Sequence, residues 1–170
     1  MAENVYILGI TMTKFGKHAD KDVVDLGAEA AMGALADAGV TMGEMGILGA
    51  GNLMNASSGF GQRLQKQIGQ TGIPVYNVAN ACATGATALR TVIMAVKAGE
   101  CDMGLAVGVE KLSGAGLLGG GGRPKSDSNV WSPEGRYGAV TSTDGRIGTD
   151  AMPGTFAQVG MEYGHKYGGA

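Results

Sequence analysis

Residues 77–99 read NVANACATGATALRTVIMAVKAG and contain one of the two cysteines of the chain. A segment rich in Asn, Ala and Thr leads into an apolar helical pattern, and Cys82 lies at the junction. Leu89, Ile93 and Val96 recur at the spacing that is typical of one face of a helix. The stretch therefore predicts a strand that turns directly into a helix, with a thiol at the turn.

The same alternation of strand and helix extends to both sides of this stretch. Short apolar runs, typical of buried strands, are found at residues 5–10, 46–54, 75–81 and 102–110. Helical patterns lie between them, at residues 23–39, at residues 61–70 and from Cys82 to Gly99. The alternation predicts an α/β fold, with a mixed sheet of mainly parallel strands covered by helices on both faces.

The helix expected over residues 23–39 carries its own end signals. Asp20 and Asp22 are plausible N-caps, because a carboxylate accepts hydrogen bonds from the free N–H groups of a helix start. Gly39 suits the left-handed residue that often ends a helix. The predicted buried face consists mostly of alanine and comprises Val24, Ala28, Ala31, Leu35 and Ala38.

Glycine is unusually abundant, with 32 residues in a chain of 170. The glycines follow no period, which excludes collagen and solenoid repeats. Many lie where strands and helices are expected to end, or beside alanine inside helices. Small residues at such places let neighbouring elements approach closely, so we expect tightly packed layers.

Composition and charge exclude several classes of protein. The chain is 44% hydrophobic and 16% charged, which is typical of globular proteins, and its net charge of −2 argues against nucleic-acid binding. No apolar run approaches the roughly 20 residues that span a bilayer, and the N-terminus lacks the features of a secretion signal. Cys82, Cys101, His18 and His165 form neither a zinc pattern nor a CxxC motif. We expect a cytoplasmic protein without a metal.

The character of the sequence changes after Lys111. Residues 113–148 show no sustained periodicity and include the run GGGG, so they predict a long loop excursion. A further helix is expected over residues 155–167. We therefore predict an α/β domain over residues 1–111 and a separate, incomplete segment over residues 112–170.

Cys82 has two interpretations when the residues are taken alone. A thiolate at a helix start is favoured by the free N–H groups there, which can also bind an oxyanion on an attacked carbonyl. Thr84, Gly85 and Thr87 are small, so a substrate could approach the backbone closely. The alternative is that Cys82 is a small buried core residue, as cysteines commonly are. Position and spacing leave both interpretations open, and the core residue is the commoner case.

NACATGATAL, which contains Cys82, resembles the nucleophilic cysteine motif of the thiolase superfamily, particularly of the sterol-carrier-protein-type thiolases. The resemblance extends beyond the motif. VYILGITMTKFGKH resembles the first strand of that group, AVKAGECDMGLAVGVEKLSG the helix and strand after the nucleophile, and PGTFAQVGMEYGHKYG the first loop-domain helix. It implies a thiolase-like layered sandwich, of which this chain holds the N-terminal half and part of the loop domain.

The resemblance also implies a chemistry. Cys82 would take an acyl group from a coenzyme A thioester, and its own backbone N–H would help to form the oxyanion hole. The reaction would condense acyl-CoA units or cleave a 3-ketoacyl-CoA, with coenzyme A as a substrate and no separate cofactor. Met152 and Pro153 match the loop-domain segment that lines the acyl pocket of the family. Arg123 could meet the phosphates of coenzyme A, although a solvated loop surface is the commoner role for such a charge.

The resemblance does not supply a complete catalytic set. The family's Gly-His-Pro segment, its second oxyanion-site Asn and its second catalytic cysteine have no counterpart in these 170 residues. His165 lies in an unrelated context and is expected to be a solvated helical residue. Cys101 is expected to be structural. A C-terminal half would therefore have to provide the missing groups, and we expect the chain by itself to be inactive.

The expected partners and alternatives follow from the same resemblance. Acyl-CoA and coenzyme A would be the ligands, and the chain would join a C-terminal thiolase half or form a dimer or tetramer. In the family, the third strand pairs across a two-fold axis, which here would be residues 75–81. Some relatives act with a small zinc-ribbon companion. The alternatives are a non-catalytic subunit that binds acyl-CoA or a partner protein, and a component of a thiolase-like retro-aldolase.

Overall fold

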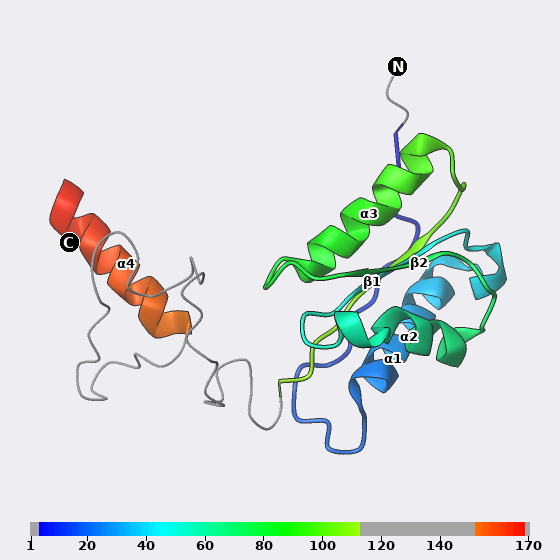
Figure 1. Ribbon diagram of the computed structural model, residues 1–170, viewed down its shortest axis with the longest axis horizontal. Coiled ribbons are helices and arrows are strands. Elements are labelled where there is room, and N and C mark those ends of the chain that lie inside the picture. Colours follow the sequence, from blue (N-terminus) through cyan, green and yellow to red (C-terminus); the bar gives the residue numbers. More distant parts are fainter. Residues whose placement is uncertain (1–3, 113–151, 169–170) are drawn as a thin grey trace. The chain divides into compact units, whose positions relative to one another are not determined.

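The computed structural model describes residues 4–112 and 152–168 (Figure 1). The chain divides into two compact units, Met1–Lys111 and Leu112–Ala170. The first unit is a parallel sheet with helices on both faces. The second contributes one described helix, α4 (Met152–Tyr167), which contains the helix expected over residues 155–167 and begins earlier.

Three short strands form the sheet of the first unit, namely β1 (Leu48–Gly51), β2 (Val75–Val78) and β3 (Leu105–Gly108). Their order is β2-β1-β3, and both pairings are parallel. A parallel pair cannot be closed by a tight turn, so each connection passes through a helix. The predicted α/β fold with mainly parallel strands is confirmed, and in the described part of the chain the sheet is wholly parallel and not mixed.

Helices cover both faces of the sheet in Figure 1. α3 (Thr84–Ala98) lies on one face, and α1 (Val23–Ala38) with α2 (Phe60–Ile68) lies on the other. Two short 3-10 helices, η1 (Met42–Glu44) and η2 (Ala56–Ser58), occur in the connections before and after β1. The result is a three-layer unit of helices, sheet and helix.

The two faces are packed by different kinds of side chain. On the α1/α2 face, Phe60, Leu64 and Leu48 are each 0% exposed and belong to one large hydrophobic cluster. On the α3 face, the buried cluster contains only Ile47, Val92 and Ala95. The α1/α2 face therefore holds most of the hydrophobic core.

Glycines in the strands let α3 come close to the sheet. A Cβ atom added to Gly49 would lie 2.7 Å from the Ala88 carbonyl oxygen, and one added to Gly108 would lie 2.7 Å from the Cα atom of Gly85. Real Cβ atoms do not approach other atoms so closely, so only glycine fits at these two strand positions. The expectation of tightly packed layers is met on the α3 face.

The predicted ends of α1 are confirmed. The Asp22 carboxylate accepts hydrogen bonds from the N–H groups of Val24 at 2.7 Å and Asp25 at 2.9 Å, which makes Asp22 the N-cap. The Asp25 carboxylate accepts in return from the Asp22 N–H at 2.9 Å, which completes a capping box. Gly39 ends the helix in the left-handed conformation, with φ of 70°.

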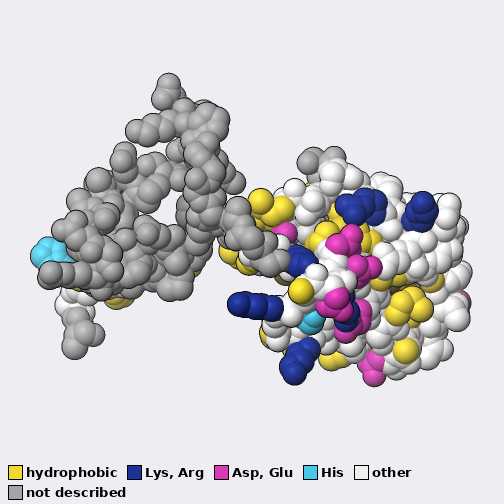
Figure 2. All heavy atoms as spheres, turned by 90° about the horizontal axis from the view of Figure 1, so that it is seen from below, with side chains coloured by type: hydrophobic (Ala, Val, Ile, Leu, Met, Phe, Trp, Pro, Cys, Tyr) yellow, Lys and Arg dark blue, Asp and Glu magenta, His cyan; other side chains and the backbone are white. Residues whose placement is uncertain are grey.

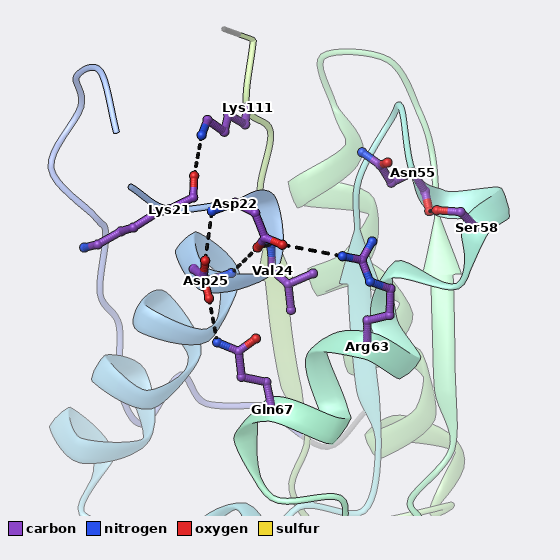
Figure 3. Close-up of polar contacts among 9 residues, drawn as sticks. All are labelled: Lys21, Asp22, Val24, Asp25, Asn55, Ser58, Arg63, Gln67 and Lys111. Carbon is purple, nitrogen blue, oxygen red and sulfur yellow. Dashed lines mark hydrogen bonds and ion pairs between the residues drawn. The ribbon is translucent and has the colours of Figure 1, made fainter. Parts of the chain in front are cut away.

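Polar contacts join the start of α1 to α2, as Figure 3 shows. The Gln67 side-chain amide donates to the Asp25 carboxylate at 2.9 Å, and an Arg63 guanidinium nitrogen lies 3.5 Å from the Asp22 carboxylate. Both groups of the ion pair are more than half exposed, so its contribution to stability is small. The contacts help to set the orientation of α1 relative to α2, and they add little to the free energy of unfolding.

The prediction of a buried strand over residues 5–10 is wrong. The segment has no assigned secondary structure, and Tyr6, Ile7 and Ile10 are 73%, 65% and 72% exposed. It lies along α1 instead, where Gly9 contacts Ala34 and Ala38. A strand needs a neighbour for its backbone groups, and among the described residues no strand pairs with this segment.

The stripe of Leu89, Ile93 and Val96 is not the face of α3 that contacts the sheet. Leu89 is 39% exposed, and Ile93 and Val96 are only partly buried. The buried positions are instead Thr84, Ala88, Val92 and Ala95. The glycines of the strands explain which residues are buried, because a helix that lies so close to the sheet leaves little room beneath it for side chains larger than valine.

Candidate active site

Cys82 lies at the edge of the sheet where all three parallel strands end. It follows β2 and precedes α3. Backbone hydrogen bonds connect the three strand ends. The Asn52 N–H donates to the Val78 carbonyl at 3.2 Å, and the Val109 N–H donates to the Gly51 carbonyl at 3.0 Å. In open α/β sheets this edge is the usual place for ligand binding.

The side chain of Cys82 is a free, exposed thiol. The interpretation of Cys82 as a small buried core residue is therefore wrong. The N-cap of α3 is Ala83, whose side chain offers no acceptor to the N–H groups at the helix start. An exposed thiol beside an uncapped helix start is an arrangement that suits a nucleophile.

The turn that contains Cys82 is tight. Asn80 and Cys82 form an isolated bridge, and Ala81 between them has a φ of +44°. The Ala83 N–H donates to the Asn80 carbonyl at 2.9 Å. The chain thus reverses within a few residues and enters α3 directly, as the sequence predicts.

Thr84 does not lie where its small size suggests. Its small size suggests room for a substrate, but the side chain is 7% exposed and is engaged in hydrogen bonds. Its hydroxyl accepts from the Asn80 N–H at 2.7 Å and donates to the Ala81 carbonyl at 2.7 Å. Thr84 therefore lies beneath the turn instead of facing a substrate, whereas Gly85 is exposed.

Asn52 and Glu110 form a second polar group at the same edge. Asn52 is 0% exposed, and its amide donates to the Val109 carbonyl at 2.7 Å and to the Glu110 carboxylate at 3.3 Å. The other Glu110 oxygen accepts from the Leu53 N–H at 2.9 Å. These bonds tie the loop after β1 to the end of β3. In the sequence, a polar residue follows soon after each of these strands. The sequence does not show that Asn52 pairs with Glu110, which lies 58 positions away.

Lys111 closes the edge on the side of α1. Its ammonium group donates to the His18 carbonyl at 2.8 Å and to the Lys21 carbonyl, as Figure 3 shows for the second contact. The end of β3 is thereby fixed to the loop that leads into α1. Among the described residues no group of three or more His, Cys, Asp or Glu side chains could hold a metal ion.

Cys101 lies at the opposite edge of the sheet, before β3, where the strands begin. It is partly buried against Gly46. Burial raises the pKa of the Cys101 thiol, and the negative charges of Glu100 and Asp102 raise the same pKa further. Its position and its protonated thiol suit the structural role that was expected.

The surface beside α1 and α2 carries charges of both signs. Figure 2 shows Lys and Arg side chains interspersed with Asp and Glu on the face of the first unit that is in view. A shallow depression of about 380 Å³ lies there, and Asp22, Val24, Arg63, Lys66 and Gln67 line it. It does not include Cys82, and two of its lining residues, Asp22 and Arg63, form an ion pair with each other. We therefore place the candidate site at Cys82.

The other predicted site residues belong to the second unit. Met152 and Pro153 are the first residues of α4. Arg123 lies outside the described residues. Their predicted contacts with acyl-CoA stay predictions. His165 is exposed on α4, as expected. Within the described ranges, no helix combines the length and the apolar character that crossing a bilayer requires.

Comparison with known proteins gives a consistent family. Residues 5–124 match the family model described as "Thiolase, N-terminal domain". Sterol carrier protein 2 of Gallus gallus is 33% identical over 172 aligned residues, which cover 99% of this chain and 30% of that protein. Acetyl-CoA acetyltransferase of Methanothermobacter thermautotrophicus is 37% identical over 114 residues, which cover 65% of this chain and 30% of that protein.

A third relative carries a different name. Non-specific lipid-transfer protein-like 2 of Caenorhabditis elegans is 30% identical over 167 residues, which cover 96% of this chain and 40% of that protein. The chain spans about 30% of the length of the first two relatives and 40% of the third.

Proposed function

Because this chain belongs to the thiolase family, we propose that it provides the nucleophile of a thiolase-type acyl-CoA acyltransferase, and that Cys82 carries the acyl group. The observation that carries the proposal is the exposed, free thiol of Cys82 at the start of α3. The family match and the acetyl-CoA acetyltransferase relative support the class of reaction.

The proposed first step is an acyl transfer. The Cys82 thiolate attacks the carbonyl carbon of the acyl-CoA thioester, and the carbonyl oxygen becomes an oxyanion. The backbone N–H of Cys82 and the positive end of α3 would stabilise that oxyanion. The carbon–sulfur bond to coenzyme A then breaks, the coenzyme A sulfur takes a proton, and an S-acyl cysteine remains.

In the second step the acyl group leaves Cys82. A second acyl-CoA loses a proton from its α-carbon, and the resulting carbanion attacks the S-acyl carbonyl to give a 3-ketoacyl-CoA. Cleavage of a 3-ketoacyl-CoA is the reverse of these two steps. Coenzyme A takes part as a substrate, so this chemistry needs no further cofactor.

The groups that move protons are proposed to come from outside this sequence. In the described part of the first unit, no histidine has a hydrogen bond to Cys82. Because the chain spans about 30% of the length of the acetyltransferase relative, we propose that a C-terminal half or a partner subunit provides them. Met152, Pro153 and Arg123 are the proposed contacts for acyl-CoA within this chain.

Turnover by the native assembly tests the proposal. Cys82→Ser should lose both condensation and thiolysis by several powers of ten, because a nucleophile and its base act as a unit. Cys101→Ser is the matched control, since it removes the other thiol of the chain, and it should keep activity. Turnover that survives Cys82→Ser would contradict the proposal.

A second candidate is a non-catalytic subunit that binds acyl-CoA or another lipid. The names of two relatives, sterol carrier protein 2 and non-specific lipid-transfer protein-like 2, favour it, because these proteins align with 99% and 96% of this chain. Cys82→Ala separates the two candidates. A binding subunit would retain acyl-CoA and form no covalent adduct before or after the substitution.

A further inference from the structure

The turn that presents Cys82 adopts a conformation that its own sequence disfavours. Ala81 has a φ of +44°, and in the described ranges the other non-glycine residue with positive φ is Gln70. The Cβ atom makes this region unfavourable for L-residues, and alanine lacks the side-chain hydrogen bonds by which Asn and Asp tolerate it. Another residue must therefore hold Ala81 in place.

Thr84 is placed to hold it. The Thr84 hydroxyl accepts from the Asn80 N–H and donates to the Ala81 carbonyl, and both bonds measure 2.7 Å. The Asn80 N–H precedes the Ala81 Cα atom along the chain, and the Ala81 carbonyl follows it, so the two bonds span this residue. The side chain is 7% exposed, so water competes weakly for these bonds.

The methyl group of Thr84 fixes the direction of its hydroxyl. A Cβ atom added to Gly51 would lie 3.0 Å from the Thr84 Cγ2 atom, so the methyl group packs directly on the strand. Threonine thus combines a contact that locks the side chain with a hydroxyl that bonds the turn. Valine would keep the shape and lose the hydroxyl, whereas serine would keep the hydroxyl and lose the methyl group.

We infer that Thr84 is a positioning residue for the nucleophile, and that it acts by holding Ala81 in the left-handed conformation that presents the Cys82 thiol. The inference rests on the proposed function only in treating Cys82 as the nucleophile. It concerns the geometry of the turn, so a chemical probe that needs no acyl-CoA can test it.

The experiment measures alkylation of the chain by iodoacetamide, in its native assembly, with the rates at Cys82 and Cys101 followed by peptide mass. Thr84→Val should slow the reaction of Cys82 at least about tenfold relative to Cys101, because the two hydrogen bonds of the hydroxyl no longer favour the turn. Hydrogen exchange at the Asn80 amide should accelerate in the same variant. Thr84→Ser should react close to the wild-type rate.

Thr91→Val is the matched control. The Thr91 hydroxyl also donates to a backbone carbonyl, that of Thr87 at 2.9 Å, but it lies about two turns beyond Thr84 along α3. This variant should leave the rate at Cys82 unchanged. A wild-type rate in Thr84→Val, or an equal loss in Thr91→Val, would overturn the inference.

A second substitution tests the role of Ala81 separately. Glycine adopts positive φ without the Cβ penalty, so adding Ala81→Gly to Thr84→Val should recover much of the lost rate. If Thr84→Val does not fold, Thr84→Ser combined with the Asn80 exchange rate still decides the matter, because a serine hydroxyl must keep that amide protected. A double variant no faster than Thr84→Val, or an unprotected Asn80 amide in Thr84→Ser, would overturn the inference.

Failure of this inference and failure of the proposed function give different results. A chain that responds to Thr84→Val in this way and is never acylated would refute the acyltransferase proposal alone. A chain that is acylated on Cys82 and ignores Thr84→Val would refute the positioning role alone.

Discussion

The two faces of the sheet show two ways of packing a helix onto strands. The α1/α2 face is filled by large side chains such as Phe60 and Leu64, both 0% exposed. On the α3 face the strands carry glycines and fewer large side chains are buried, so the backbone of α3 lies close to Gly49 and Gly108. The first face supplies buried apolar area, which stabilises the fold. The second holds α3 at a short, fixed distance from the sheet. Cys82 lies just before the start of this helix.

The comparison predicts that damage to the two faces has different consequences. Truncating a large residue on the α1/α2 face should lower stability and leave the Cys82 turn as it is. Enlarging a small residue on the α3 face should cost less stability and disturb the turn. The following predictions test this separation, and the substitution with the greatest cost comes first.

Phe60→Ala should have the largest effect on stability. The ring is fully buried and approaches α1, since a Cβ atom added to Gly27 would lie 3.2 Å from its Cζ atom. We expect a loss of about 3–5 kcal/mol in the free energy of unfolding, measured with urea. Phe15→Ala is the control, because Phe15 is 84% exposed, and it should change stability by less than about 0.5 kcal/mol. Equal effects of the two substitutions would contradict the packing described here.

Gly108→Ala and Gly85→Ala probe one contact from its two sides. An added Cβ at Gly108 would lie 2.7 Å from the Gly85 Cα atom, whereas one at Gly85 would meet only the Gly108 Cα atom at 3.7 Å. Gly108→Ala should therefore cost about 1–3 kcal/mol and change the rate of Cys82 alkylation. Gly85→Ala should be neutral or stabilising by up to about 1 kcal/mol, because alanine favours a helix. A Gly108→Ala variant that leaves both stability and Cys82 reactivity unchanged would break the comparison.

The smallest effect concerns acid sensitivity on the α1/α2 face. Hydrogen bonds from the Asp22 N–H and then from the Gln67 amide hold the pKa of the Asp25 carboxyl below its usual value. A carboxyl whose pKa is lower in the folded state adds stability above its unfolded pKa, about 3.9, and that stability is lost as the pH falls through the folded pKa. The melting temperature should therefore fall below pH 4, and it should fall less in Asp25→Asn. An identical pH profile for the two proteins would contradict the role of this capping box.

Local signals in the sequence predicted much of the fold. Asp22 and Gly39 mark the ends of α1 because caps depend on a residue's own chemistry and its nearest neighbours. The prediction of a strand over residues 5–10 was wrong because an apolar run does not show which other element the segment packs against. The stripe of Leu89, Ile93 and Val96 did not reveal which face of α3 is buried, because that face depends on glycines from separate strands.

At the candidate site, too, features that depend on neighbouring residues were predicted and features that depend on the folded chain were not. The position of Cys82 between strand and helix follows from the local pattern, and the structure places it there. The roles of Thr84 and Ala81 depend on the path of a turn, and a sequence does not reveal that one alanine has positive φ. The Asn52–Glu110 contact joins two loops that are distant in sequence, so it required the register of the sheet.

The central claim is that Cys82 is the thiol that carries the acyl group. Its most direct test is to incubate the native assembly with isotopically labelled acetyl-CoA, quench with acid and map the labelled peptides. We predict that the label is found on the peptide that contains Cys82, and that the peptide that contains Cys101 is unlabelled. Label on Cys101, or no covalent label under conditions where the assembly turns over, would contradict the account.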